Sequence, residues 1–94
     1  MSATWTEEVF GTTKPIVAMC HLDPLPGDPS FGIDASMQQV VDHAAEDLLA
    51  LQRGGVDAVM FSNEFSLPYT TNVETVTVAA MASVIGQLSS EISV

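Results

Sequence analysis

Three polar side chains in this 94-residue sequence stand at the ends of short apolar runs and could act on a ligand. His21 ends a run that begins at Ile16, and an imidazole with a pKa of about 6.5 can serve as an acid, a base or a metal ligand. Asn63 and Glu64 end a second run, and they offer an amide and a carboxylate that suit a hydroxylated ligand, a divalent cation or a proton in transfer. For His21, a structural histidine bonded to loop backbone is an equally supported interpretation.

Cys20 precedes His21 directly, yet the sequence does not favour a cysteine–histidine catalytic pair. Neighbouring side chains on an extended strand point to opposite faces, so a thiolate and an imidazolium cannot meet there. We therefore expect Cys20 to be a small buried apolar residue. The second histidine, His43, lies beside Gln39 and Asp47 on the polar side of a predicted helix, where a solvated position is expected.

Four segments must position these side chains. The apolar runs 16–22 and 57–63 are continuous rather than alternating, which predicts strands covered on both faces. Apolar residues at helical spacing predict a helix over 36–53, with a capping box at its start and a glycine pair at its end. A looser stripe, rich in β-branched residues, predicts a helix over about 73–90. This stripe comprises Val76, Ala80, Met81, Val84, Ile85 and Leu88.

The order strand, helix, strand, helix is typical of a parallel sheet with right-handed crossovers. A short helix is also expected over 4–10, and residues 92–94 resemble the first residues of another strand. Two strands alone leave both sheet edges unpaired. We therefore expect 1–94 to be a single partial α/β domain. It would be either the first two β/α units of an eightfold barrel of roughly 250 residues, or one copy in an oligomer that closes the sheet.

Composition excludes two classes of partner. Twelve acidic residues against two basic ones give a formal charge of −10, which repels nucleic-acid phosphates and anionic lipid. No apolar stretch approaches the roughly 20 residues needed to insert across a membrane. The lone Cys20 allows no intrachain disulfide and makes a cytoplasmic location the default expectation. Hydrophobic residues make up 47%, which predicts a folded domain rather than a disordered chain.

Longer motifs extend across most of the chain. They are His-Leu-Asp-Pro-Leu-Pro-Gly-Asp-Pro at 21–29, Gly-Gly-Val-Asp-Ala at 54–58, and the stretch 62–69, which begins Ser-Asn-Glu and ends Pro-Tyr. Together with 8–11 and 79–82, they resemble the N-terminal part of the BtpA/SgcQ family, most closely its SgcQ-like branch. The resemblance implies a TIM-type barrel of the ribulose-phosphate-binding kind. In TIM barrels the loops after strands seven and eight frequently bind phosphate, and these lie beyond the two units seen here.

Members of the family are described variously as photosystem I biogenesis factors, sugar-operon proteins and nucleoside triphosphatases. The resemblance therefore implies that the whole protein binds or converts a small sugar-like or phosphorylated metabolite. From their positions at the ends of the two strands, His21 and Glu64 are the expected catalytic residues. Substrate binding is expected at Asp23, Gly27, Ser62, Asn63 and Tyr69. Many members carry an acid directly before the asparagine that matches Asn63, whereas this sequence has Ser62 there.

Several alternatives stay open. The sequence specifies no metal ligand set and no cofactor, and it does not decide whether the protein is an enzyme. The expected partners are a small molecule and either further copies of the chain or the remainder of the same barrel. The alternative function is a non-enzymatic assembly or biogenesis factor, which would bind basic protein surfaces through its acidic exterior.

Overall fold

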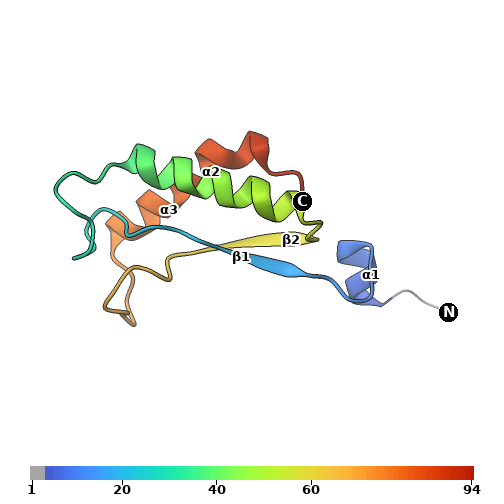
Figure 1. Ribbon diagram of the computed structural model, residues 1–94. Helices are drawn as coiled ribbons and strands as arrows, with labels where there is room; N and C mark the ends of the chain where they lie inside the picture. Colours follow the sequence, from blue (N-terminus) through green and yellow to red (C-terminus); the bar gives the residue numbers. More distant parts are fainter. Residues whose placement is uncertain (1–3) are drawn as a thin grey trace.

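The computed structural model describes residues 4–94, and it has the expected order of elements (Figure 1). The elements are α1 (Trp5–Phe10), β1 (Val17–His21), α2 (Met37–Arg53), β2 (Ala58–Ser62), α3 (Thr75–Leu88) and a 3-10 turn (Ser89–Glu91). The short helix α1 ends as predicted at Gly11, which adopts the left-handed conformation with φ 76°.

The two strands form a parallel two-stranded sheet, as predicted. His21 lies opposite Ser62 in the register, so the polar ends of both strands meet at one edge of the sheet. The Leu22 amide donates to the Ser62 carbonyl oxygen at 2.8 Å and extends the pairing by one residue. The coarse architecture is therefore a mixed α/β fragment in which α2 connects neighbouring parallel strands.

The helix α2 begins and ends where local signals predict. The Ser36 hydroxyl accepts from the Gln39 amide while the Gln39 side chain accepts from the Ser36 amide, which completes a capping box. The helix ends at a glycine pair in which Gly55, with φ 86°, is the left-handed residue. The buried stripe of this helix comprises Val40, Val41, Ala44 and Leu48.

The helix α3 packs through a slightly different stripe from the predicted one. Val76 is 40% exposed, whereas Thr77, at the next position, is buried with Ala80 and Val84. The buried positions follow spacings of three and four residues from Thr77, which is the geometry of one helix face. Val76 instead turns toward the loop at Gly27. The predicted stripe was therefore wrong at its first residue.

Within residues 4–94, only one face of the sheet is covered. Figure 1 shows α2 and α3 lying together on that face, where Cys20 and Leu22 are buried beneath them. On the opposite face, Val17 and Met19 are each 43% exposed and Met60 is 53% exposed. The prediction that both faces are covered was therefore wrong for these residues, because both helices pack on the same side.

The segment 92–94 forms no strand, in contrast to the prediction. The Gln52 side chain holds this end of the chain through two hydrogen bonds. Its Nε2 donates to the Glu91 carbonyl oxygen at 3.0 Å, and its Oε1 accepts from the Ser93 amide at 2.6 Å. Ile92 is extended, with φ −80° and ψ 120°, but side-chain contacts take the place of strand pairing. Within residues 4–94, no helix is long and apolar enough to cross a bilayer.

Candidate functional site

The loops that follow β1 and β2 are joined by one carboxylate. Asp28 accepts a hydrogen bond from the Leu25 amide at 2.6 Å and another from the Ser66 hydroxyl, 38 residues further along the chain. Ser66 is only 8% exposed and Leu25 is fully buried, so this junction is shielded from water. Asp28 thereby holds the two loops together at the C-terminal end of the sheet.

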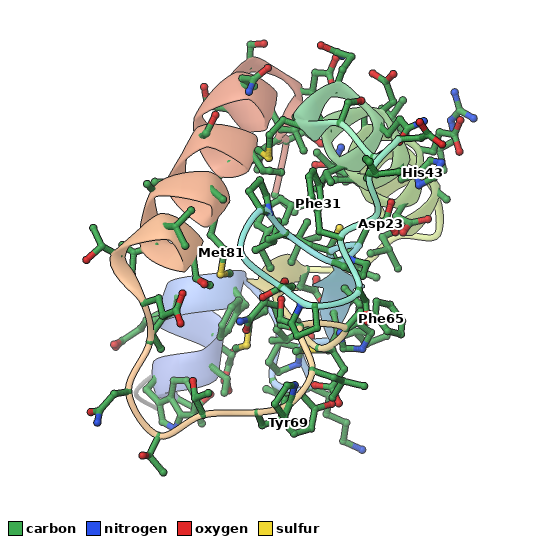
Figure 2. All side chains as sticks on the ribbon, turned by 90° about the vertical axis from the view of Figure 1, so that its left-hand side faces the viewer. Asp23, Phe31, His43, Phe65, Tyr69 and Met81 are labelled. Atoms are coloured by element: carbon green, nitrogen blue, oxygen red, sulfur yellow. The ribbon has the colours of Figure 1, made fainter. Side chains whose placement is uncertain are left out.

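A pocket of about 310 Å³ lies between these two loops and the first turn of α3. It lies at the end of the sheet that Figure 2 faces, where the loop bearing Tyr69 passes below the helices. Three of the predicted substrate-binding residues line it together: Gly27, Asn63 and Tyr69. Its volume is at the lower end of the range of about 300–1,000 Å³ typical of small-molecule sites.

Three polar side chains in this pocket make no hydrogen bond within residues 4–94: Asn63, Glu74 and Thr77. Thr77 lacks a partner although it is only 8% exposed. Over the same residues, no fully buried side-chain oxygen or nitrogen lacks a partner, so the Thr77 hydroxyl must reach the pocket rather than the core. An amide and a hydroxyl can each donate and accept, which suits a ligand that carries hydroxyl groups.

Gly27 has a structural reason to be glycine. Its φ is 95°, and a Cβ at this position would lie 2.8 Å from Cγ1 of Val76. The loop backbone can therefore approach the first turn of α3 only where no side chain intervenes. Gly27 shapes the pocket through this close approach.

His21 and Ser62 form a separate pair outside the pocket. Nδ1 of His21 and Oγ of Ser62 are hydrogen-bonded at 2.8 Å, and the imidazole meets the Phe65 ring edge-to-face at 6.0 Å between centroids. His21 instead lines a second groove, also about 310 Å³, with Met19 and Leu51 along the free edge of β1. Its Nδ1 partner is thus a side chain of the neighbouring strand and not loop backbone.

Glu64 and Tyr69 close the second loop on itself. The Tyr69 hydroxyl donates to the Glu64 carbonyl oxygen at 2.8 Å and to its carboxylate at 2.9 Å. The hydrogen bond to the Glu64 carboxylate raises the pKa of Tyr69, so this phenol stays protonated. Both residues are exposed, and Glu64 does not line the pocket.

Asp23 is paired with a residue that the sequence placed simply in solvent. Its carboxylate is hydrogen-bonded to Nδ1 of His43 on α2, and Figure 2 shows the two side chains together, well apart from Tyr69. His43 is exposed as predicted, with 61% of its side chain accessible. The hydrogen bond from Asp23 is the main reason why the pKa of His43 is raised. Twenty positions separate the pair, and no local sequence signal indicates it.

Cys20 is buried against α2, as predicted. It is 1% exposed, and its Sγ contacts the Ala44 carbonyl oxygen at 3.9 Å. Burial, with a smaller contribution from Asp47, raises the pKa of the thiol and opposes formation of a thiolate. Cys20 and His21 lie on opposite faces of the sheet, so the structure offers no cysteine–histidine pair.

Sequence reasoning missed five polar residues of the pocket. They are Asp28, Ser66, Thr70, Glu74 and Thr77. Only Thr77 had a usable signal, because it is a polar residue at helical spacing from Ala80 and Val84. Within residues 4–94, no three His, Cys, Asp or Glu side chains are grouped as a metal ion would require.

Comparison with known proteins gives the chain relatives along almost its whole length. It is 62% identical to the sgc region protein SgcQ of Escherichia coli K12 over 91 residues, which are 97% of this chain and 34% of that protein. It is 33% identical over 82 residues to an uncharacterized protein of Pyrococcus abyssi, covering 87% of this chain and 31% of the relative. It is 30% identical over 82 residues to the photosystem I biogenesis protein BtpA of Synechocystis, covering 86% of this chain and 28% of the relative.

The chain thus spans about a third of the length of these relatives. No solved structure matches it. The sequence model of the BtpA family matches residues 12–94, a stretch that contains both strands, α2, α3 and the pocket between their loops. The chain therefore belongs to the BtpA family.

Proposed function

We propose that this chain forms one part of a small-molecule site in a longer, barrel-shaped BtpA-family protein, and that its pocket binds a sugar-like metabolite. The observation that carries the proposal is the pocket in which Asn63 and Thr77 present free polar groups at the C-terminal ends of two parallel strands. Ligands of parallel α/β folds bind at that end of the sheet, because the loops and helix N-termini meet there.

Family relatives support a sugar-related ligand only in general terms. The resemblance to the family implies a sugar-like or phosphorylated metabolite, and some members are described as nucleoside triphosphatases. Acid–base roles for His21 and Glu64 stay predictions, because neither side chain lines the pocket. A role for Asp23 in substrate binding also stays a prediction, since its carboxylate is held by His43. A cytoplasmic location is proposed from the lone cysteine alone.

Thermal-shift screening of the chain against a panel of sugars and sugar phosphates tests the proposal. A ligand that binds only the folded state raises the melting temperature, and the rise grows with the ratio of free ligand concentration to Kd. Asn63→Ala should abolish that rise, whereas Asn72→Ala, which removes an exposed amide outside the pocket, should leave it intact. Stabilisation by no member of the panel, or equal loss in both variants, would argue against this site.

A second candidate is a non-enzymatic assembly factor. Two observations favour it: the formal charge of −10, and the uncovered sheet face bearing Met19 and Met60. A relative from Synechocystis is named as a photosystem I biogenesis protein. This function predicts association with a basic protein that weakens with added salt, and no stabilisation by small molecules.

The uncovered face also bears on assembly. Either further copies of the chain or the remainder of the same barrel would cover it, since isolated two-stranded sheets are marginal in water. Sedimentation of the chain distinguishes the two cases. A dimer or larger oligomer would indicate that copies of the chain cover the face, whereas a monomer would leave that role to the remainder of the barrel.

A further inference from the structure

The charges around the pocket have one sign. Apart from the Tyr69 phenol, its ionisable lining side chains are Asp28 and Glu74, both carboxylic acids. The two basic residues of the chain, Lys14 and Arg53, do not line it. A phosphate group in this pocket would therefore face two carboxylates without a compensating cation.

The first turn of α3 does not compensate for that charge. The free amides at a helix start usually attract anions. Here the N-cap residue is Glu74, whose carboxylate points toward the same loop: its Oε2 lies 3.8 Å from where a Cβ on Gly27 would stand. The side chain of Glu74 makes no capping hydrogen bond, so its charge remains at the pocket.

The remaining polar groups suit hydroxyl groups. Thr77 is more than nine-tenths buried, lines the pocket and has no hydrogen-bond partner within residues 4–94. Asn63 adds a free amide that can donate and accept, and the carboxylates can accept from hydroxyl donors. A neutral molecule with several hydroxyl groups can form hydrogen bonds with all of these side chains, and it places no negative charge beside the two carboxylates.

We infer that this pocket binds an uncharged, hydroxyl-bearing ligand, or the uncharged part of a larger one, and that it excludes phosphate. The inference rests on the proposed function, since it names the chemistry of the ligand for the same site. If the whole protein takes a phosphorylated metabolite, the phosphate then lies away from the loops after β1 and β2.

The test compares two probes that differ only in a phosphate group, D-ribose and D-ribose 5-phosphate, with inorganic phosphate as a third. Ligand-observed NMR on the full chain would measure the three affinities. Ribose is expected to bind about tenfold more tightly than its phosphate ester at low salt, because of like-charge repulsion across a few ångströms. Raising the ionic strength from roughly 0.01 M to roughly 0.3 M should lower this ratio of the ribose affinity to the ester affinity, because salt screens the repulsion between the phosphate and the carboxylates.

Matched variants assign the effect to the pocket. Glu74→Gln should lower the ratio of the ribose affinity to the ester affinity to about threefold, because it removes one charge near the phosphate. Glu8→Gln, the same change on α1, should leave this ratio unaltered. Thr77→Val should weaken ribose binding, and Thr71→Val, outside the pocket, should not.

The outcomes separate the two proposals. If the ester binds as tightly as ribose or more tightly, and Thr77→Val weakens it, the exclusion of phosphate is wrong while the site stands. If neither sugar binds, or if Thr77→Val changes no affinity, both the ligand class and the proposed site are wrong.

Discussion

The two ends of the sheet use their polar side chains differently. At the N-terminal end, the Asp57 carboxylate accepts from the Ile16 amide at 2.9 Å, and Gln52 binds Glu91 and Ser93 through both atoms of its amide. At the C-terminal end, Asn63 and Thr77 line a pocket and bind no other residue of the described chain. Polar groups hold the chain together at both ends, through Asp28 and Ser66 at the C-terminal one, where Asn63 and Thr77 in addition remain available to a ligand.

That contrast supports our proposal that the C-terminal end of the sheet binds the ligand. A polar group that is shielded from water usually finds a protein partner, because leaving it unsatisfied costs free energy. Thr77 has no such partner in the described chain, and its hydroxyl agrees with that rule by reaching the pocket, where water or a ligand can bind it.

The largest effect on stability is expected from Asp57→Ala. This change leaves the exposed Ile16 amide to bond to water instead of a carboxylate, and it should lower the free energy of unfolding by about 1.5 kcal/mol. Urea denaturation measures it, and Asp34→Ala, which removes an exposed carboxylate with no hydrogen bond, is the control. Equal stability of both variants would show that the N-terminal end does not depend on this carboxylate.

A smaller loss is expected from Gln52→Ala. The two hydrogen bonds of the Gln52 amide are exposed, so their joint contribution should be about 1 kcal/mol. Hydrogen exchange of the Ser93 amide should become faster, since that amide donates to Gln52. Gln87→Ala provides the control, because its side chain contacts only Ser83 on the same helix. An unchanged exchange rate of the Ser93 amide would contradict its hydrogen bond to Gln52.

At the other end, Asn63→Ala and Thr77→Val should change stability little. Neither side chain bonds to the protein, so the free energy of unfolding should stay within about 0.5 kcal/mol of the parent value. The same denaturation experiment checks both variants. A loss comparable to that of Asp57→Ala would mean that these groups serve the fold, and the comparison between the ends would fail.

The smallest effect concerns pH and the pair of His43 with Asp23. The pKa of His43 is raised in the folded chain, chiefly by its hydrogen bond to Asp23. The hydrogen bond of protonated His43 therefore stabilises the folded chain fully below the ordinary histidine pKa of about 6.5. This stabilisation is lost as the pH rises through the raised pKa of His43 in the folded chain. The difference in melting temperature between the parent and His43→Gln should shrink between about pH 5.5 and about pH 8.5. A difference that is independent of pH would contradict this pairing.

Local features of the fold could be predicted from the sequence. The capping box at Ser36, the glycine pair that ends the same helix and the two apolar runs are each determined by a few neighbouring residues, and all three predictions were confirmed. The parallel pairing of the strands also followed, because a helical crossover leaves few other topologies. The sequence did not predict that one face of the sheet is left uncovered, since this depends on what packs against the face that bears Met19 and Met60.

The pocket was harder to predict for the same reason. Its two loops are joined by Asp28 and Ser66, which are 38 positions apart, and the pairing of Asp23 with His43 likewise depends on tertiary structure. Position at a strand end identified Asn63 correctly as a pocket residue, but it also selected His21, which faces a different groove. The end of a strand thus indicates the region of a site, and the side of the sheet decides which side chains reach it.

Mapping of backbone amide shifts on the chain during titration with D-ribose tests the central claim most directly. The account predicts that the perturbed amides cluster at 27–28, 63–70 and 74–77, around the pocket at the C-terminal ends of β1 and β2. Shifts concentrated near Ile16, Gln52 and Asp57, or no shifts at all, would contradict it.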